Sequence, residues 1–532
     1  MASSTVTASP DLPIQWRDST PHTTFLASCW SHTHNHHRAT ETRIPRAVVH
    51  ATSTRHAVEV VRLAVAQDCR VSVRSGGHSW AGWSVRDDAI LLDLGALKDG
   101  KFDRSDTSTS HVTTTTSTTA NPSTGKDAGL AYDPATSILA APPSATGRAV
   151  NEFLADHGRM FAGGHCPDVG LGGFLLQGGM GWNCKNWGWA CEALVGLDVV
   201  TAKGEEVYAS ESENEDLFWA ARGAGPGFPA IVTRFHLKTR PIQQMFQSIY
   251  FWPISEYRKV LQWVIDVRSQ PCSASSLLHF HLSISPAKQV SPTADPDTEI
   301  VCLGQHIPQY TTPVIFANFL TFKPDRAQGE AALRPLDDDP ARPPNALPET
   351  FFAASTSLRG QYTPQEAANP PGHRYCSDNA YISNDEVDVP AVLERAFTTL
   401  PNRLSFALYF SMNPTSRRSH YKGKDGESAN MALSMQSDHY FALYTIWKEA
   451  EEDERIQGWT ASVMSEVERH AVGSYLGDAD FQVRQTRFWG EAEGKRLMEV
   501  RRKWDPEGRI CGFLDVGDKS GVEGLKNEFE WK

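Results

Sequence analysis

Glycine-dense loops are the sequence feature that most narrows the folds open to this chain. They stand at Gly76-Gly77, between Gly163 and Gly181, and from Gly223 to Gly227. Such loops let backbone N–H groups approach a phosphate closely, above all beside a helix N-terminus. The chain nevertheless has no G-x-x-x-x-G-K-S/T sequence, and no G-x-G-x-x-G follows its first expected strand. The loops therefore predict tight turns with room for a phosphate, and they exclude phosphate-loop NTPases and standard dinucleotide-binding Rossmann domains.

The length of 532 residues exceeds what one hydrophobic core usually supports, so at least two domains are expected. Lys and Arg total 51 against 63 Asp and Glu, and this net charge of −12 disfavours binding to nucleic acid. No run reaches the ~18 consecutive apolar residues that a membrane helix needs. The first residues lack a secretory signal, and the nine cysteines form no C-x-x-C pair. We expect an intracellular, cytoplasmic protein without nucleic-acid or membrane partners.

The first part of the chain alternates between short strands and helices. Ser53 or Thr54 can cap a helix with one apolar face, and Thr146 can cap a second helix. The apolar face of the first helix consists of Ala57, Val58, Val61, Ala64 and Val65. Strands are expected at 47–50, 70–74, 90–94 and 194–201. Residues 105–119 are nearly all Ser and Thr, which predicts a flexible excursion.

The residue pattern changes near Arg240-Pro241, where we place a domain boundary. Ser255 opens an amphipathic helix, and further helices are expected over 454–472 and before Asp505-Pro506. The proline-rich, acidic residues 323–348 predict a loop. Strands are expected at 277–284, 312–322, 404–412 and 439–447. The predicted class is α+β, divided into an N-terminal segment 1–45, a first domain 46–240, a second domain 241–475 and a C-terminal segment 476–532.

Hydrolase and metal chemistry find little support in the sequence. Gly77 to Ala81 approaches the G-x-S-x-G elbow of serine hydrolases, but alanine replaces the final glycine and no helix pattern follows. The chain has no H-E-x-x-H sequence. A histidine cluster has no acidic or cysteine partner at ligand spacing; it comprises His32, His34, His36 and His37. We expect neither a serine hydrolase nor a metal site.

Segments that follow one another along the chain together resemble one flavoprotein family. They are 71–79 (VSVRSGGHS), 164–182, 197–204, 222–228 and the closing pieces 475–480 and 489–506. The set resembles the FAD-linked oxidases of the vanillyl-alcohol oxidase and p-cresol methylhydroxylase type. Within them it is most similar to the berberine-bridge-enzyme-like branch, which includes 6-hydroxynicotine oxidases and oligosaccharide oxidases. The closing segment departs from the branch pattern at Gly477-Asp478.

The resemblance implies FAD attached covalently at two side chains. In this branch the histidine of R-S-G-G-H and the cysteine of G-x-C-x-x-V-G bond to the flavin, and here these are His78 and Cys166. An imidazole nitrogen and a thiolate are nucleophiles that can add to an electron-poor flavin. The backbone of residues 74–78 would meet the pyrophosphate. The implied cofactor-binding residues are His78, Cys166, Arg74, Ser75, Gly76, Gly77, Ser79, Val169, Gly170, Leu171, Gly172, Gly173, Gly178, Gly179, Ile231 and Val232.

The resemblance also implies a fold and a reaction. Two α+β subdomains and the C-terminal segment would bind FAD, and an antiparallel sheet backed by helices would bind the substrate. The substrate, a small metabolite or a sugar, would lose a hydride to flavin N5 and a proton to a base, with O2 or another acceptor. Leu171 occupies a position where strong oxidases of the branch often carry valine, which predicts hindered access of oxygen.

The base is expected on a strand of the substrate domain or in the closing segment. The candidates are Tyr409, Tyr444, His439 and Tyr475. A different reaction class stays open beside the oxidoreductase, namely a flavin-dependent or redox-neutral cyclase of a biosynthetic pathway.

Overall fold

The computed structural model describes residues 9–29, 43–98, 129–269, 293–385, 387–413, 415–417, 430–479, 484 and 486–512. The cluster of His32 to His37, the Ser/Thr-rich residues 105–119 and the strand expected at 277–284 lie outside the described residues. Within the described part of the chain, no helix is long and apolar enough to cross a membrane.

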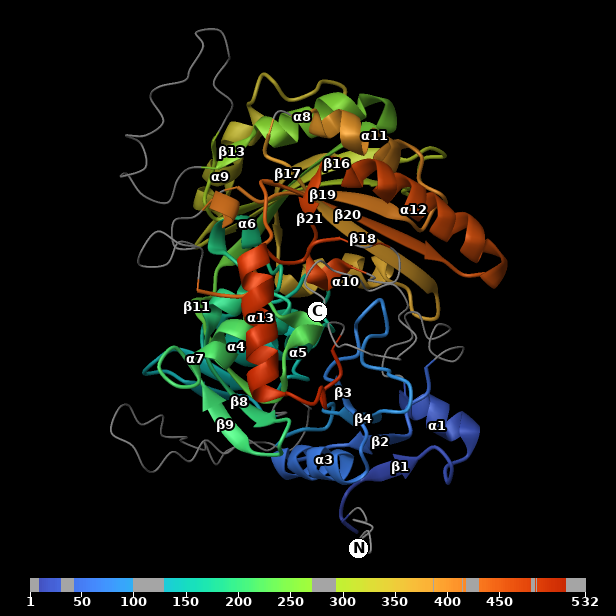
Figure 1. Cartoon of the computed structure of the whole chain (residues 1–532). Coiled ribbons are helices and arrows are strands. Elements are labelled where there is room, and N and C mark those ends of the chain that lie inside the picture. Colours follow the sequence, from blue (N-terminus) through green and yellow to red (C-terminus); the bar gives the residue numbers. More distant parts are fainter. Residues whose placement is uncertain are drawn as a thin grey trace, which may run out of the picture.

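The N-terminal sheet has four strands in the order β1-β2-β4-β3 (Figure 1). The strands are β1 (Ile14–Trp16), β2 (Ala47–His50), β3 (Val71–Arg74) and β4 (Ile90–Asp93). Strands β2, β4 and β3 run parallel, and β1 joins β2 antiparallel. Helix α3 (Thr54–Ala66) packs its predicted apolar face on this sheet, except that Val65 in its last turn is 49% exposed. Helix α1 (His22–Cys29) contacts β2.

The second sheet has five antiparallel strands in the order β5-β6-β10-β8-β9. The strands are β5 (Ala131–Asp133), β6 (Ile138–Ala141), β8 (Leu194–Thr201), β9 (Glu206–Ala209) and β10 (Ala230–Lys238). Its helices are α4 (Gly147–Ala155), α5 (Leu171–Leu176), α6 (Cys184–Trp187) and α7 (Glu215–Ala220). The side chain of Thr146 caps α4, as its sequence predicts, by accepting from the backbone N–H of Ala149. A small pair, β7 (Arg159–Met160) and β11 (Arg240–Pro241), lies beside it.

The C-terminal segment returns to these two sheets. Helix α13 (Glu491–Trp504) contacts α7 and runs down the same side of the molecule (Figure 1). Beyond it, Ile510 bridges to Val71 at the edge of the N-terminal sheet. The last described residues therefore pair alongside β3 at the edge of the N-terminal sheet.

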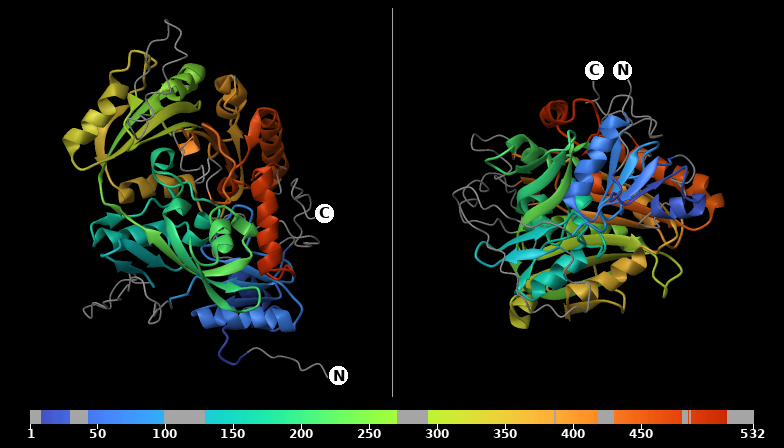
Figure 2. Two further views of the ribbon diagram at one scale, coloured as in Figure 1. Left: turned by 60° about the vertical axis from the view of Figure 1, so that its left-hand side comes forward. Right: turned by 90° about the horizontal axis from the view of Figure 1, so that it is seen from below.

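The third sheet is antiparallel and has eight strands in the order β17-β12-β16-β15-β19-β20-β18-β21. The strands are β12 (Gln244–Pro253), β15 (Thr298–Gln305), β16 (Val314–Lys323), β17 (Phe351–Thr356), β18 (Arg374–Ile382), β19 (Phe406–Ser411), β20 (His439–Trp447) and β21 (Ala471–Gly473). A short pair, β13 (Arg268–Ser269) and β14 (Thr293–Ala294), lies outside it. Figure 2 shows this sheet as one layer, with the two smaller sheets facing one side of it.

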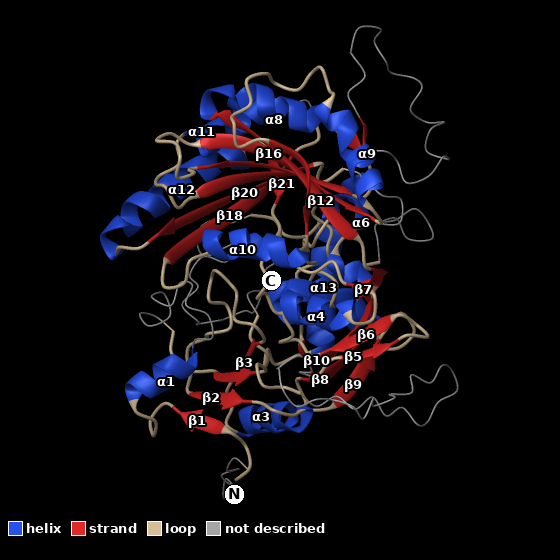
Figure 3. Cartoon of the chain, turned by 180° about the vertical axis from the view of Figure 1, so that it is seen from behind, coloured by secondary structure: helices blue, strands red, loops and turns tan. Residues whose placement is uncertain are grey.

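Helices cover the outer face of the eight-stranded sheet. They are α8 (Tyr257–Asp266), α9 (Arg326–Asp337), α11 (Val389–Thr398) and α12 (Asp453–Glu468). Helix α10 (Leu358–Ala368) lies on the inner face, between the sheet and the rest of the molecule (Figure 3). The α+β class and the antiparallel sheet backed by helices are as expected.

Helix α9 corrects the loop expected over residues 323–348. Asp325 caps this helix by accepting a hydrogen bond from the backbone N–H of Gln328 at 2.9 Å. Ala332, Leu333 and Leu336 are buried, and burial of such a face stabilises a helix even where intrinsic propensity is modest. Pro335 lacks a backbone N–H and so removes one i→i−4 hydrogen bond, but it stands in the last turn and leaves the preceding turns of the helix intact. The high proline and acid content masked this apolar spacing in the sequence.

Candidate active site

A cavity of about 1040 Å³ lies between the glycine loops and the inner face of the eight-stranded sheet. The loop after β3, the segment 164–173 and strand β10 form one side of it. Strands β12, β15, β16, β19 and β20 form the other side, together with α10 and the closing segment around Asp478. Residues from distant parts of the chain thus meet around one space.

The glycine wall of the cavity is formed by two loops in backbone contact. A Cβ atom on Gly76 would lie 2.8 Å from the backbone nitrogen of Gly170, and one on Gly170 would lie 2.9 Å from that of Gly76. Real Cβ atoms do not approach so closely, so both positions require glycine for the loops to pack. At Gly173, which lines the cavity, a Cβ would meet no described atom within 4 Å. The wall there is bare backbone that faces open space.

His78 and Cys166 both line this cavity. His78 lies in the loop after β3, and Trp80, two residues later, packs edge-on against Tyr375 of the large sheet with ring centroids 4.6 Å apart. The Cys166 thiol accepts a hydrogen bond from Asn369 Nδ2 at 3.7 Å, at the end of α10. Burial, with the nearby carboxyls of Asp478 and Asp168, raises the pKa of Cys166 to about 12. The thiol is therefore protonated at neutral pH.

Twelve of the expected cofactor-binding residues line the cavity. They are Arg74, Ser75, Gly76, Gly77, His78, Ser79, Cys166, Val169, Gly170, Gly172, Gly173 and Val232. The side chain of Arg74 has a structural role. Its guanidinium donates hydrogen bonds to the backbone carbonyls of Ser28 and Cys29 and lies 2.9 Å from the carboxylate of Asp93.

Four of the expected cofactor-binding residues do not line the cavity. Leu171 is 1% exposed and packs in the hydrophobic core behind the wall, so the expected oxygen gate has no cavity face. Ile231 points into the core of the N-terminal sheet, on the opposite side of β10 from Val232. Gly178 and Gly179 adopt positive φ angles of 109° and 80° and pack against other side chains of the protein. They shape the turn before α6.

The expected base candidates divide into two groups. Tyr409 lies in the core between the large sheet and its helices, because side chains alternate along β19 and its neighbours Leu408 and Phe410 face the cavity. His439 Nδ1 lies 2.8 Å from Tyr409 Oη and does not line the cavity either. This placement argues against both as the base. Tyr444 and Tyr475 line the cavity, and burial raises the pKa of each phenol, so both are protonated at neutral pH.

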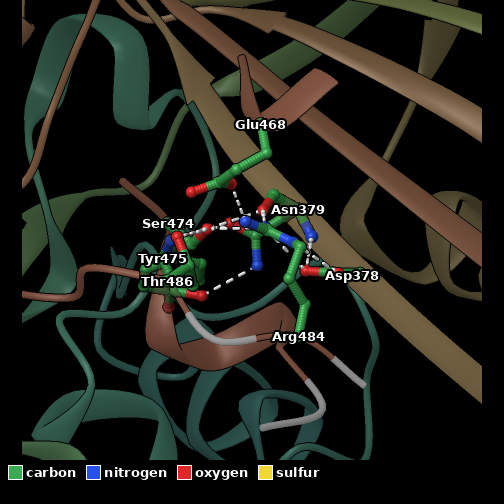
Figure 4. Close-up of polar contacts among 7 residues, drawn as sticks. All are labelled: Asp378, Asn379, Glu468, Ser474, Tyr475, Arg484 and Thr486. Carbon is green, nitrogen blue, oxygen red and sulfur yellow. Dashed lines mark hydrogen bonds and ion pairs between the residues drawn. The ribbon is translucent and has the colours of Figure 1, made fainter. Parts of the chain in front are cut away.

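The closing segment is held against the sheet by a buried ion pair (Figure 4). Asn379 accepts from the backbone N–H of Tyr475 at 2.7 Å and donates to its carbonyl at 2.8 Å. Arg484 donates to both carboxylate oxygens of Asp378, at 2.9 and 3.0 Å, and to Ser474 Oγ at 3.0 Å. The Tyr475 hydroxyl in turn accepts from the backbone N–H groups of Gly179 and Met180. Tyr475 is thereby fixed at both ends.

Three acidic residues that line the cavity, Asp478, Glu299 and Glu349, were not among the expected site residues. Asp478 accepts a hydrogen bond from Tyr440 Oη at 2.5 Å. Glu299 accepts from the backbone N–H of Asn183 at 2.6 Å, and both its oxygens lie 3.1 Å from His165 Nε2. The only sequence signal for Asp478 was its departure from the closing pattern of the resembling branch. Glu299 lies in an apolar strand and gave no signal at all.

The sheet side of the cavity is largely apolar. Phe251, Phe316, Leu303 and Leu408 stand opposite one another across four strands and all line the cavity. The rings of Phe251 and Phe316 are 4.9 Å apart. Val301 and Phe410 form the next row. Hydrogen bonds join the polar side chains at one edge to one another: Gln247 to Asn318, and Gln361 to Gln247.

Comparison with known proteins places the chain among flavoproteins. Residues 45–120 and 123–210 match the family model of an FAD binding domain. The chain is 35% identical to the FAD-linked oxidoreductase ptmO of Penicillium ochrochloron over 95% of its own length and 97% of that protein.

Solved structures share the fold at low sequence identity. The BBE-like 1 protein of Physcomitrella patens is 15% identical and superposes with a TM-score of 0.71 over 97% of this chain and 98% of that one. The glucooligosaccharide oxidase of Acremonium strictum is 16% identical, with a TM-score of 0.65 over 93% of this chain and 95% of that one. Its FAD is described as 6-S-cysteinyl and 8α-N1-histidyl.

Proposed function

The chain belongs to the FAD-linked oxidoreductases of the p-cresol methylhydroxylase and berberine-bridge-enzyme-like family, and from that premise we propose a bicovalent FAD enzyme that oxidises an apolar small metabolite. His78 and Cys166 would hold FAD, and the substrate would lose a hydride from a carbon that bears an O–H or N–H group. The observation that carries the proposal is that both side chains line one cavity with the bare glycine wall.

The residues present fit FAD. A Cβ at Gly173 would project into the open space of the cavity, so the bare backbone there leaves room for a flat or phosphorylated group in close contact. When bound, FAD supplies the two-electron acceptor for the hydride. Each covalent bond replaces one hydrogen of the cofactor and one of the side chain, so O2 would take up two electrons and two protons per bond. The glucooligosaccharide oxidase, whose FAD carries a cysteinyl and a histidyl link, supports attachment through these two residue types.

An apolar substrate fits the sheet side better than a sugar does. The row from Phe251 to Leu408 offers hydrocarbon surface and no hydrogen-bonding side chain. A sugar hydroxyl buried there without a partner would cost about 1–3 kcal/mol. We propose a metabolite with a broad apolar face and one oxidisable C–H beside a hydroxyl or amine, and O2 or another soluble acceptor as the electron sink.

The first prediction tests the covalent links. Acid precipitation of the purified protein should leave the flavin colour in the pellet. His78→Ala and Cys166→Ala should each keep one link and a coloured pellet, whereas the double variant should release its flavin to the supernatant. Mass spectrometry of flavin-bearing peptides assigns each link. Colour in the supernatant of the unmutated protein would contradict bicovalent attachment.

The substrate class is tested by anaerobic bleaching of the flavin absorbance. Polycyclic and aryl-substituted secondary alcohols and amines form one panel, and glucose oligomers of matched concentration form the other. We expect bleaching with members of the first panel only. Bleaching by the oligomers alone would overturn the apolar assignment, and no bleaching by either panel would overturn the proposed oxidation.

A further inference from the structure

Asp478 is a carboxyl in the cavity wall at the end of the turn Leu476–Asp478. Tyr440 donates to its Oδ2 at 2.5 Å, and the Tyr444 hydroxyl hydrogen-bonds the same carboxyl. Both tyrosines come from β20, so the closing segment meets the sheet face at Asp478. A carboxylate has about four acceptor sites, so two donors hold its orientation and leave capacity for a substrate proton.

The position of Asp478 is fixed by the segment that carries it. Three residues earlier, the backbone of Tyr475 is bound on both sides by Asn379, and its hydroxyl is bound by the backbone of Gly179 and Met180. A base must be held within hydrogen-bond reach of the proton it takes. The hydrogen bonds that hold Tyr475 and the hydrogen bond from Tyr440 to Asp478 restrain the carboxyl from two directions.

Asp478 and Cys166 line the same cavity, and the charge of Asp478 is one of the causes that raise the pKa of that thiol. On the proposed function, Cys166 bonds carbon C6 of the flavin, the position reported for the cysteinyl link of the glucooligosaccharide oxidase. In the flavin ring system C6 is next to the junction carbon that bears N5, the hydride acceptor. A carboxyl that shares the cavity with Cys166 and acts on its thiol would therefore serve the part of the cavity where the substrate loses its hydride.

Tyr444, Tyr475 and Glu299, which also line the cavity, are less suited to accept a proton. Tyr444 and Tyr475 are protonated phenols at neutral pH, because burial raises their pKa. Glu299 already accepts from Asn183 and faces His165 with both oxygens. Asp478 has only the two tyrosine hydroxyls as hydrogen-bond partners among the described residues.

We propose that Asp478 is the catalytic base of this enzyme. Its carboxylate takes the proton from the substrate O–H or N–H while the hydride leaves the adjacent carbon, so the C–H and O–H or N–H bonds break and a C=O or C=N bond forms. The two electrons leave with the hydride, and the proton stays on Asp478. The inference rests on the proposed function, because it assigns the proton half of that reaction.

The surroundings tune Asp478 toward this role. Burial raises the pKa of its carboxyl, and the hydrogen bonds from Tyr440 and Tyr444 and the charge of His165 oppose that rise. A base whose pKa lies nearer neutrality than that of an ordinary aspartate transfers protons more effectively at neutral pH. The titratable groups that face it are Tyr381, Tyr440, Tyr444, Tyr475, Cys166 and His165.

Asp478→Asn tests the proposal, because it keeps the shape and the acceptor oxygen for Tyr440 but cannot take a proton. With a compound that bleaches the wild-type flavin, we expect single-turnover reduction to slow by about 100-fold or more, with both covalent links and the substrate Kd unchanged. The matched control is Asp168→Asn, an exposed aspartate near Cys166 that pairs with Arg148 and does not line the cavity. It should reduce at the wild-type rate.

A thermal melt gives a readout that needs no substrate. Because the folded pKa of Asp478 is raised, ionising it costs the folded state, and wild-type stability falls as pH rises from the unfolded toward the folded pKa. Asparagine does not ionise. The Tm of Asp478→Asn should therefore exceed that of wild type by a margin that grows with pH over this range and then levels off.

The outcomes separate the two hypotheses. Near-normal reduction by Asp478→Asn, or a Tm difference that does not grow with pH, would overturn the role of Asp478. A wild-type flavin that no panel compound bleaches would overturn the proposed function instead. Loss of reduction together with loss of the covalent links would assign Asp478 to cofactor attachment and likewise overturn its role as base.

Discussion

Leu171 and Val169 are two positions apart, yet only Val169 lines the cavity. Leu171 is the first residue of α5, and its backbone N–H donates to the carbonyl of Ala145 at 2.9 Å. Its side chain points into the core that α5 shares with the five-stranded sheet. The residue that resembles an oxygen gate in the sequence is thus a packing residue in the fold.

Leu171→Val should therefore act on stability and leave oxygen access unchanged. Removing one methylene from a fully buried site leaves a small void and should cost about 1 kcal/mol of unfolding free energy. Stopped-flow reoxidation of the dithionite-reduced enzyme in aerated buffer should give the wild-type rate. Val169→Leu, which adds volume at the cavity wall, is the comparison. A faster reoxidation in Leu171→Val would show that this side chain does reach the flavin.

The closing segment contacts both sides of the cavity, the glycine loops through Tyr475 and the large sheet through Asp478. It carries Tyr475 and Asp478, and Arg484 ties it to β18 through Asp378. The Arg484 and Asp378 side chains are 11% and 3% exposed. Losing one member of such a buried pair leaves an uncompensated charge, which costs far more than the pair itself contributes.

Arg484→Met should lower the unfolding free energy by about 3–5 kcal/mol, because Asp378 is left buried without its cation. Adding Asp378→Asn to that variant should recover part of the loss, since the orphaned charge is removed. The control is Arg395→Met, which breaks a pair with Glu466 at the surface and should cost less than about 1 kcal/mol. Chemical denaturation measures all three variants. Equal losses of unfolding free energy in Arg484→Met and Arg395→Met would contradict a stabilising role of the buried Arg484–Asp378 pair.

At the scale of the whole molecule, the two smaller sheets face the large one (Figures 1 and 3), and the residues that line the cavity come from both sides. Trp80 packs against Tyr375 and Tyr444 across this boundary, and Arg148 forms an ion pair with Glu366 of α10. A cofactor that fills the cavity touches both sides. It should therefore stabilise the molecule as a unit.

Free FAD should raise the Tm of the His78→Ala/Cys166→Ala variant after its flavin has been removed. A ligand that binds only the folded state adds about 2.7 kcal/mol of stability at 100 times its Kd. Differential scanning fluorimetry over a range of FAD concentrations measures the effect, with ATP as a control that lacks the flavin. An unchanged Tm at saturating FAD would contradict binding in this cavity.

The sequence by itself determined the features that depend on short stretches of chain. The helix capped at Thr146, the strands at 194–201 and 439–447 and the α+β class follow from local spacing, because the periodicity of apolar residues and the capping side chains act within a few residues. The resemblance to the flavoprotein family, carried by motifs in a fixed order along the chain, singled out His78 and Cys166, and both side chains line the cavity.

Only the tertiary structure decided which side chains share the cavity. Both faces of β19 are apolar, so its alternation could not tell that Leu408 faces the cavity and Tyr409 the helices. Asp478 receives its partners from β20, a strand more than thirty residues earlier. Leu171 and Val169 are separated by the turn into α5, whose direction is set by packing against the sheet. Contacts of this kind depend on the relative placement of whole elements, which burial of a common core fixes and short-range residue patterns do not encode.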